Sequence, residues 1–447
     1  MLRSTQNLIV NGGFSRALNT QACGWQVVGG AANLRPVRAF DAAGLPHASQ
    51  ALELPGACLI RQPLMLPALE TERWVLRITA RAPAGSGQIR LAMCAAEDRQ
   101  HATTVALSAQ WQRCRMEATL APDSACVVEI GVDPGQPPME ITDVRLVGLR
   151  QPAPGFSIRF ETKGRMLLPS TRLRALMIED YLNLLGWRTS LNGGTGGDLL
   201  VCQKVTRFAR LLAARLGGAR VIYDLDDNEL AGDRLRAARV RLFARLVDGV
   251  TTGGDFLNAR LSRPGAPAYL LDNPVDLLDP DLRHDTQVWR GRIVWFGMPE
   301  NAWMIDALDL PERVVKITRG GDVDYDLRTI DQELISHDLA LLPLTLTEHT
   351  QAKNANRMVK CVGLGLPFLA SDTPEHRRAL ARLGMGDRVL VREDEAWADR
   401  IADVRRDYAD WKAEVAAARP AAFAAYGIEA IVDGWLDYCE RVRHRAG

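Results

Sequence analysis

The chain has 447 residues, of which 47% are hydrophobic and 24% are charged. This length accommodates two or three domains, and a formal net charge of +1 gives no indication of nucleic-acid binding. No apolar run reaches the roughly 20 residues that span a bilayer, and no signal-peptide pattern follows Met1, so we expect a cytoplasmic protein. The eight cysteines include no CxxC pair and no zinc-ligand spacing, which predicts buried free thiols.

Residues 1–150 alternate short β-type runs with clusters of turn residues. The runs at 74–80, 88–93 and 126–130 suit half-buried strands, and their regular spacing predicts an all-β sandwich. The opening NLIVNGGF at 7–14, followed by Gly24 and Trp25, resembles the start of jelly-roll carbohydrate-binding modules of families 4 and 9. The segments 110–112 and 141–146 extend this resemblance over nearly the whole domain.

The tryptophans of this region allow two interpretations. Trp25, Trp74 and Trp111 can stack on sugar rings, because aromatic faces suit that contact. The alternative is that they fill the core, which we favour for Trp25 and Trp111. Glycan binding by this domain is therefore a weak hypothesis, because a fold does not establish a function.

A Pro/Gly linker at 151–155 precedes a change of pattern. Strand-like runs then alternate with amphipathic helical stretches, which predicts α/β layers with parallel sheets. The first half is expected to contain strands at 156–161, 198–203, 220–224, 249–252 and 269–271, and helices at 172–185, 207–216, 233–247 and 256–260. The second half is expected to contain strands at 292–297, 314–318, 339–342 and 368–370, and two last helices, 393–419 and 421–443, separated by Pro420.

The segment 353–371 is the most informative part of the chain. Lys353, Asn356 and Arg357 lead into an apolar helical run that ends at Gly365 and is followed by a short strand. The first turn of a helix exposes free N–H groups and the positive end of the dipole, so it is suited to a phosphate group. Lys353 and Arg357 are four residues apart and are expected to share a helix face. This segment resembles the donor-binding helix of GT-B glycosyltransferases.

Other pieces of residues 156–445 resemble glycosyltransferases of the family-4 type: 170–174, 201–204, 221–227, 248–252, 272–276 and 337–344. The resemblance implies a GT-B fold: an acceptor-side Rossmann-like domain at 151–276 and a donor-side one at 277–447, after a β-sandwich at 1–150. It also implies transfer from a nucleotide sugar to a glycan, a glycoconjugate or a lipid-linked acceptor, in surface polysaccharide biosynthesis. Lys353, Asn356, Arg357, Lys360 and Gly297 are then the candidates for donor and phosphate binding.

One departure from the family pattern affects the donor site. Family-4 enzymes carry two glutamates eight positions apart that contact the donor, and the alignment places Ala352 and Lys360 there. Glu348 is near but out of register, and both Glu348 and His349 are candidate contacts for the donor sugar; the alternative for His349 is a solvated loop residue. Retention of anomeric configuration is expected over inversion. The alternative function is a non-catalytic glycan- or nucleotide-binding scaffold.

Asp224, Asp226 and Asp227 follow a predicted strand and allow three interpretations. Paired carboxylates bind Mg²⁺ or Mn²⁺, but the GT-B resemblance implies no metal and no other cofactor. Such carboxylates can instead cap the next helix or orient an acceptor hydroxyl. The remaining acceptor-side candidates follow strands or begin a helix: Gln203, Lys204, Arg172 and Arg174. The two arginines can bind an anionic acceptor or form surface ion pairs.

The stretch 233–245 is rich in arginine and predicted to be helical. Basic amphipathic helices can lie on anionic membrane surfaces, so peripheral contact at the inner face of the membrane is one interpretation. The favoured alternative is that Leu235, Ala238, Leu242 and Phe243 pack on the sheet and leave the arginines in solvent.

Overall fold

The computed structural model describes residues 17, 18, 21, 22, 25–28, 32–36, 50–67, 73–95, 100–121, 123–149, 156–163, 168–193, 196–231, 233–264, 266–278, 280–348 and 350–444. The motif at 7–14, Gly24, the linker at 151–155 and His349 lie outside the described residues. Contacts divide the chain into two units. The first comprises Met1–Pro154 and Asp180–Trp187, and the second comprises Gly155–Glu179 and Arg188–Gly447.

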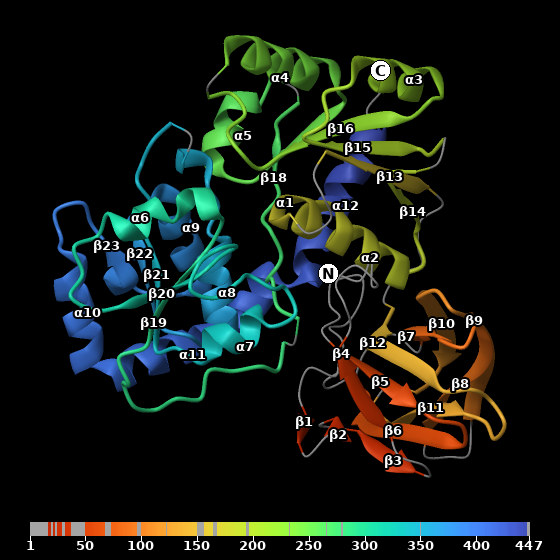
Figure 1. The fold of residues 1–447 in the computed structure, drawn as a ribbon. Helices are drawn as coiled ribbons and strands as arrows, with labels where there is room; N and C mark the ends of the chain where they lie inside the picture. The colour runs from red at the N-terminus through yellow and green to blue at the C-terminus, as the bar shows by residue number, and fades with distance from the viewer. Residues whose placement is uncertain are drawn as a thin grey trace. The chain divides into compact units, whose positions relative to one another are not determined.

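The first unit contains two five-stranded antiparallel sheets, drawn in red to yellow in Figure 1. One has the order β10-β7-β12-β5-β4 and the other β3-β6-β11-β8-β9. Side chains alternate between the two faces of each strand, and the inner faces form one apolar core. The strand bounds are β1 Ala17–Leu18, β2 Gln21–Ala22, β3 Gln26–Val28, β4 Asn33–Pro36, β5 Gln50–Leu54, β6 Cys58–Met65, β7 Arg73–Arg81, β8 Ser86–Ala95, β9 Gln100–Ser108, β10 Gln112–Thr119, β11 Ala125–Val132 and β12 Met139–Gly148.

The three tryptophans of the sandwich differ in position. Trp25 and Trp74 belong to the core, and the Trp74 indole donates to the Leu120 carbonyl at 3.2 Å. Trp111 is half-buried, with the Arg81 guanidinium 4.7 Å from its ring centroid. The core interpretation therefore holds for Trp25, whereas Trp111 lies under a cation and is not among the described residues of the core.

A buried ion network also belongs to the first unit. The carboxylate of Asp180 is fully buried and lies within ion-pair distance of Arg77 at 3.0 Å, Arg113 at 2.6 Å and Arg145 at 3.5 Å. Arg77 also pairs with Asp143 at 2.6 Å. Burial by itself raises the pKa of Asp180, but the three guanidinium groups hold it well below its usual range. Asp180 lies in a helix that follows the sandwich by 30 residues, so this helix end is built into the sandwich unit.

The second unit contains two parallel sheets. The first has the order β14-β13-β15-β16-β17-β18, and helices follow its strands as the alternating pattern predicted. The bounds are β13 Ser157–Thr162, α1 Pro169–Thr171, a π-helical turn Arg172–Leu176, α2 Met177–Leu184, β14 Arg188–Leu191, β15 Leu199–Gln203, α3 Phe208–Leu216, β16 Arg220–Leu225, α4 Arg234–Leu246, β17 Gly249–Thr252, α5 Asp255–Leu261 and β18 Tyr269–Leu270.

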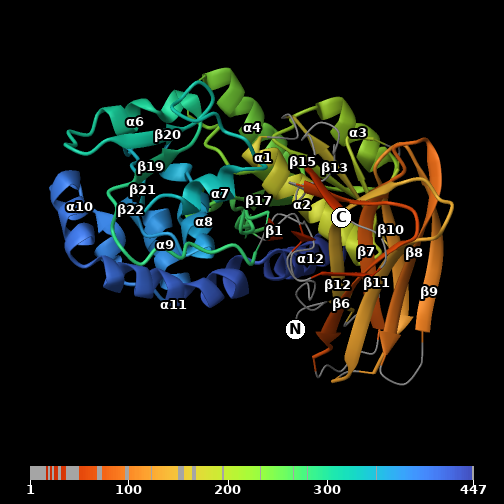
Figure 2. The same cartoon turned by 60° about the horizontal axis from the view of Figure 1, so that its bottom comes forward.

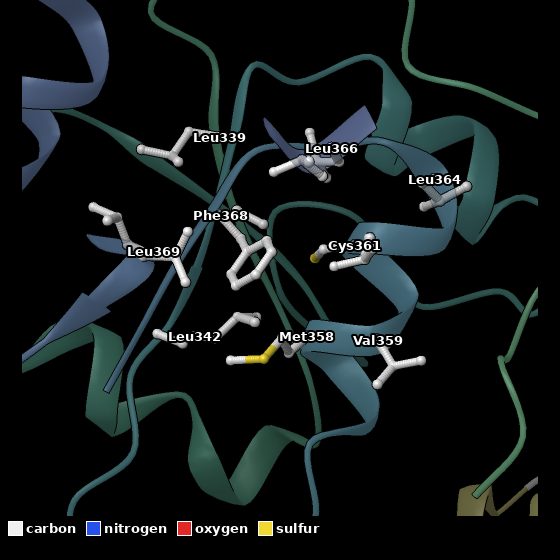
Figure 3. Close-up of a cluster of buried hydrophobic side chains, with 14 of the residues drawn as sticks. Leu339, Leu342, Met358, Val359, Cys361, Leu364, Leu366, Phe368 and Leu369 are labelled. Atoms are coloured by element: carbon white, nitrogen blue, oxygen red, sulfur yellow. The ribbon is translucent and has the colours of Figure 1, made fainter. Parts of the chain in front are cut away.

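The second parallel sheet has the order β20-β19-β21-β22-β23. Its bounds are β19 Ile293–Phe296, η2 Pro299–Asn301, α6 Trp303–Asp306, β20 Val314–Ile317, α7 Ile330–Ile335, β21 Leu339–Leu342, η3 Thr350–Ala352, α8 Asn356–Leu364, β22 Phe368–Ser371, α9 Pro374–Leu383, η4 Asp387–Val389, β23 Leu390–Val391, α10 Trp397–Arg406, α11 Tyr408–Tyr426 and α12 Ile428–His444. Figure 3 shows Met358 and Cys361 of α8 pointing toward Phe368 of β22. An antiparallel sandwich followed by two parallel α/β sheets confirms the predicted fold class.

Two sequence predictions about helices were wrong. Pro420 does not separate the last helices, because it lies inside α11, which continues to Tyr426 and ends before Gly427. Pro420 has no backbone N–H and so cannot make the helical hydrogen bond at its position. The buried residues of α11, including Trp411 and Val415, pack on the core and keep the helix continuous despite that missing bond. In α4, Phe243 is buried as predicted, but Leu235, Ala238 and Leu242 are exposed. Ala237, Val240 and Ala244 form the rest of the buried face.

One described stretch, Tyr408–His444, is long and apolar enough to cross a bilayer by length and composition, contrary to the sequence prediction. Packing accounts for its apolar residues. Trp411 lies in the core of the second sheet, and Trp435 stacks on Phe160 of the first sheet at 5.8 Å. The Tyr438 hydroxyl also bonds to the backbone of Val250, at 2.8 Å from N and 3.1 Å from O. This last helix therefore returns to the first sheet, and its composition is weak evidence for a membrane span.

The seven described cysteines are free thiols, six of them buried and Cys94 half-buried. Burial raises the pKa of Cys114 and of Cys126 to about 11, which keeps these thiols protonated at neutral pH. The prediction of buried free thiols is confirmed for six of the seven described cysteines, and Cys94 is the exception in burial.

Candidate functional site

The order of the second parallel sheet defines where a ligand would bind. The chain leaves β19 for β20 on one side and reaches β21 on the other, so β19 and β21 meet at a topological switch point. In open α/β sheets, ligands bind beyond the carboxyl ends of the strands at such a point. Here the carboxyl end of β19 is Phe296, followed by Gly297.

Arg357 reaches this strand end from the first turn of α8. Its Nη1 donates to the Phe296 carbonyl at 3.2 Å, and an added Cβ on Gly297 would lie 3.5 Å from that nitrogen. The side chain is half-buried, and no carboxylate of the described residues pairs with it. Burial lowers the pKa of Arg357 to about 10, so it remains a cation at neutral pH. Partly buried cations at helix N-termini commonly bind anions, so Arg357 stays the predicted phosphate contact.

Gly297 is fixed by close packing. An added Cβ would lie 2.9 Å from Cζ2 of Trp295, whose ring is fully buried and cannot move aside. The absence of a side chain thus keeps the strand end open beside Arg357. Asn356 is the first residue of α8, and Ala355 before it provides no side-chain cap. The first N–H groups of α8 therefore have no capping side chain.

Lys353 occupies a different position from the one predicted. It lies before the N-cap of α8 and not within its first turn, so it does not share a helix face with Arg357. Its ammonium donates to the Asp227 carboxylate at 2.8 Å. Asp227, just beyond the carboxyl end of β16, also pairs with Lys204 beyond β15. The loops of the two parallel sheets thus meet in a Lys204–Asp227–Lys353 ion cluster.

A second contact joins the same loops. The Asn228 side-chain amide donates to the backbone carbonyl of Glu348 at 2.8 Å, which places Glu348 beside the loop after β16. The Glu348 side chain is exposed. Lys360 is buried within α8 and donates to the carboxylate of Asp331, so its charge is already neutralised. Phosphate binding by Lys360 stays a prediction. The pairing of Lys360 with buried Asp331 does not favour it.

Three of the acceptor-side candidates have structural contacts. Arg174 is fully buried and pairs with the carboxylate of Asp224, and it also donates to Leu271 O at 2.6 Å. Arg172 is buried and pairs with Asp276. These arginines do not form the surface ion pairs considered from the sequence. Arg174 connects the π-helical turn to β16 and to the segment after β18, and Arg172 connects the same turn to Asp276. Any role of these residues toward an anionic acceptor stays a prediction.

Gln203 and Asp226 are the buried polar residues nearest to the ends of β15 and β16. The amide nitrogen and oxygen of Gln203 are both buried without a hydrogen-bond partner in the described part of the chain. Asp226 lies 2.8 Å from the Lys204 ammonium. Burial raises the pKa of Asp226 despite the opposing charge of Lys204, so this carboxylate is a stronger base than an exposed one.

The carboxylates of this region already have cationic partners. Among the described residues, no group of three or more histidine, cysteine, aspartate or glutamate side chains is arranged to hold a metal ion. Asp224 is engaged by Arg174 and Asp227 by two lysines, so their oxygens already have cationic partners. That catalysis needs no metal stays a prediction, and the arrangement of these carboxylates does not argue against it.

His376 is a residue that the sequence reasoning missed. It lies in the first turn of α9, beyond β22, and its Nδ1 is 2.7 Å from the Ser371 carbonyl. Burial, and to a smaller extent the positive charge of Arg357, lowers the pKa of His376 to about 4. The pattern Thr373-Pro374-Glu375 is a helix-start signal that follows a predicted strand, so it could have placed His376 at the same sheet edge.

No protein-family model and no curated protein matches the chain. Among solved structures, it is similar to Anabaena Alr3699/HepE in complex with UDP and glucose, at 12% identity and a TM-score of 0.47, over 64% of this chain and 100% of that one. It is also similar to an α-glucosyltransferase in complex with UDP and a 13-mer DNA, at 10% identity and a TM-score of 0.44, over 64% and 100%. A third match is TmCBM61 in complex with β-1,4-galactotriose, at 16% identity and a TM-score of 0.24, over 32% and 98%. All three TM-scores are below 0.5, so the fold assignment rests on the sheet topology described above.

Proposed function

We propose that the chain is a glycosyltransferase that moves a sugar from a nucleotide sugar to a glycan, a glycoconjugate or a lipid-linked acceptor. The observation that carries this proposal is Arg357, a half-buried cation that has no carboxylate partner among the described residues. It lies at the switch point of a parallel sheet, in the first turn of a helix and beside a glycine. The diphosphate of a nucleotide sugar would supply two negative charges to pair with Arg357, and oxygens to accept hydrogen bonds from it and from the first N–H groups of α8.

The chemistry requires stabilisation of the leaving group. When the bond between the sugar C1 and the diphosphate oxygen breaks, positive charge develops on the sugar ring and negative charge on the diphosphate. Arg357 and the free N–H groups of α8 would stabilise that negative charge, because they are oriented before the reaction begins. Lys353 would add a second cation once it separates from Asp227. Retention of anomeric configuration is part of this proposal.

The acceptor side of the proposal rests on the first parallel sheet. Asp226 is buried at its carboxyl edge, and Asn228, two residues on, bonds to the loop that precedes α8. We place the acceptor hydroxyl at Asp226, which would orient it and accept its proton as the new glycosidic bond forms. Gln203, with its unpartnered buried amide, would orient Asp226 or the acceptor.

A non-catalytic scaffold is the second candidate function. The observation that favours it is the Lys360–Asp331 pair, which places a neutralised lysine where family-4 enzymes carry a donor-contacting glutamate. The transferase and a nucleotide-binding scaffold both require nucleotide binding at Arg357 and differ in turnover, whereas a glycan-binding scaffold does not require a nucleotide.

The test begins with thermal shifts of the full chain against UDP, GDP, ADP, CDP and dTDP, because a ligand that binds the folded state raises its stability. A nucleotide sugar of the preferred base is then followed for release of the diphosphate, with and without acceptor sugars. Binding with turnover supports the transferase, and binding without turnover supports the scaffold. Absence of a shift with every nucleotide would overturn the transferase and the nucleotide-binding scaffold, and would leave only a glycan-binding scaffold.

A further inference from the structure

The outer surface of α3 and α4 carries a concentration of exposed apolar side chains. Five of the twelve exposed large hydrophobic residues in the described part of the chain lie on these two short helices. Leu216 and Leu235 are each 81% exposed. We define the α3–α4 face by its exposed leucines and arginines: Leu212, Leu216, Leu235, Leu242, Leu246, Arg207, Arg210, Arg215, Arg234, Arg236, Arg239, Arg241 and Arg245.

The two helices form one surface because they pack against each other. The rings of Phe208 at the start of α3 and Phe243 of α4 are 5.5 Å apart, edge to face. Arg239 of α4 donates to the Thr206 carbonyl at 2.7 Å, just before α3. Both helices connect neighbouring parallel strands, and they lie near each other in Figure 1 and Figure 2.

The exposed leucines are arranged in stripes. Leu235, Leu242 and Leu246 are separated by seven and four residues, so they lie along one line of the α4 surface. Leu212 and Leu216 are four apart on α3 and share a face in the same way. The core does not need these residues, since α4 is held by a different set that includes Val240 and Phe243.

The charge of the face is positive. The segment Arg234–Leu246 contains five arginines and no acidic residue, and Phe208–Leu216 contains two arginines and no acidic residue. Nearby acidic groups neutralise part of this charge: Glu229 pairs with Arg236, Asp248 with Arg215 and Glu161 with Arg210. Asp233 is occupied as the N-cap of α4. Among the described residues, Arg207, Arg234, Arg241 and Arg245 have no carboxylate partner.

We propose that the α3–α4 face docks on an anionic lipid surface, with the leucine stripes in the acyl boundary and the arginines at the headgroups. Exposed leucines flanked by unpaired arginines match both layers of such a surface. A second copy of the chain is less suitable, because two arginine-rich faces would repel each other. Nucleic acid would neutralise the arginines but leave the leucines in water. The proposal goes beyond the proposed transferase activity and does not depend on it.

The test is flotation of the full chain with vesicles of phosphatidylcholine containing about 30% phosphatidylserine, compared with phosphatidylcholine alone. We expect binding to the anionic vesicles that falls steeply with salt. Leu235→Ser with Leu242→Ser should weaken binding roughly ten-fold or more, and each of Arg241→Ser and Arg245→Ser should weaken it about five-fold. All four positions are exposed, so the melting temperature should not change.

The matched control is Val288→Ser with Arg283→Ser, an exposed apolar residue and an exposed cation in the segment that precedes β19. This variant should bind vesicles like the wild type. Equal binding to neutral vesicles, or wild-type binding by the leucine variant, would overturn the proposal. A change of oligomeric state in the leucine variant without a change in lipid binding would assign the face to a second copy. Binding of RNA that depends on the arginines, together with no vesicle binding, would also overturn it.

Discussion

The ammonium of Lys353 lies 2.8 Å from the carboxylate of Asp227, and this pair joins the loop before α8 to the loop after β16. Burial alone raises the pKa of Asp227, but Lys204 and Lys353 hold it well below its usual range. Arg357 differs, because it has no carboxylate among the described residues. Before a diphosphate binds, Lys353 is thus paired with a carboxylate and Arg357 is not. Substitutions of these two residues should therefore affect binding differently.

Arg357→Ala should weaken binding of the preferred nucleoside diphosphate roughly 10- to 150-fold, because a charge-assisted hydrogen bond contributes about 1.5–3 kcal/mol. Arg357→Lys should recover part of the loss, since an ammonium cannot supply the bidentate fork. Calorimetric titration measures both. Arg313→Ala, at an exposed position in the same half, is the control. Wild-type affinity in Arg357→Ala would remove the phosphate site from this strand end.

Lys353→Ala should weaken binding of the diphosphate by less than Arg357→Ala does. In the wild type, the free energy that Lys353 gains from contacting the phosphate is offset by the loss of its contact with Asp227. Asp227→Asn should tighten diphosphate binding several-fold, since it removes a competing negative charge and frees the ammonium. The control is Asp326→Asn, which removes a carboxylate paired with Arg328 elsewhere in the second half. If Asp227→Asn weakens binding, Asp227 positions Lys353 for phosphate instead of competing for it.

The pKa of His376 should rise when a diphosphate binds. The charge of Arg357 helps to lower the pKa of His376 to about 4, and a bound anion would neutralise that charge. Burial likewise lowers the pKa of His284 to about 4, but its charged neighbours are Lys412, Asp338 and Arg290. NMR titration of both histidines, with and without nucleotide, should show a rise for His376 and none for His284. An equal response of the two would mean that the ligand acts elsewhere.

The same two histidines predict how stability depends on pH. Their folded pKa values, about 4, are below the unfolded value of about 6.5, so the unfolded chain binds more protons between these limits. Stability is therefore complete above pH 6.5 and is lost as the pH falls toward 4, by up to about 1.4 kcal/mol per pH unit for each histidine. Urea unfolding of the wild type and of His284→Gln across this range should give a shallower slope in the variant. Parallel slopes would contradict the assignment.

Asp180→Ala should destabilise the first unit by about 3–5 kcal/mol, because it removes the buried carboxylate that Arg77, Arg113 and Arg145 share and leaves Asp143 to face Arg77 alone. Glu117→Ala is the control, since its pair with Arg73 is exposed and should contribute less than about 1 kcal/mol. Denaturant unfolding of the full chain measures both changes. A chain that begins at residue 153 would lack Arg77, Arg113 and Arg145, and we expect it to be poorly soluble. A well-folded truncation would show that the sandwich is dispensable.

Local pattern was sufficient for most elements of this chain. Alternation of period two predicted the sandwich strands, including 74–80, and apolar runs with helical periods between them predicted the parallel sheets. Spacing and composition identified the strand predicted at 292–297, which the structure has at Ile293–Phe296, and the helix start at Asn356 and Arg357, but they placed Lys353 wrongly in that first turn. These features are local, because a strand end, a helix start and a glycine are each determined by a few neighbouring residues.

The partners of charged residues were decided only by the tertiary structure. The sequence does not show which arginines have a carboxylate partner. Arg174 is buried against Asp224, whereas Arg357 has no carboxylate partner among the described residues. The same holds for α4, where apolar residues occupy two faces and packing buries Phe243 but leaves Leu235 in solvent. Pairing and burial depend on residues far apart in the chain that folding brings together, whereas periodicity reports only on a segment's own neighbours.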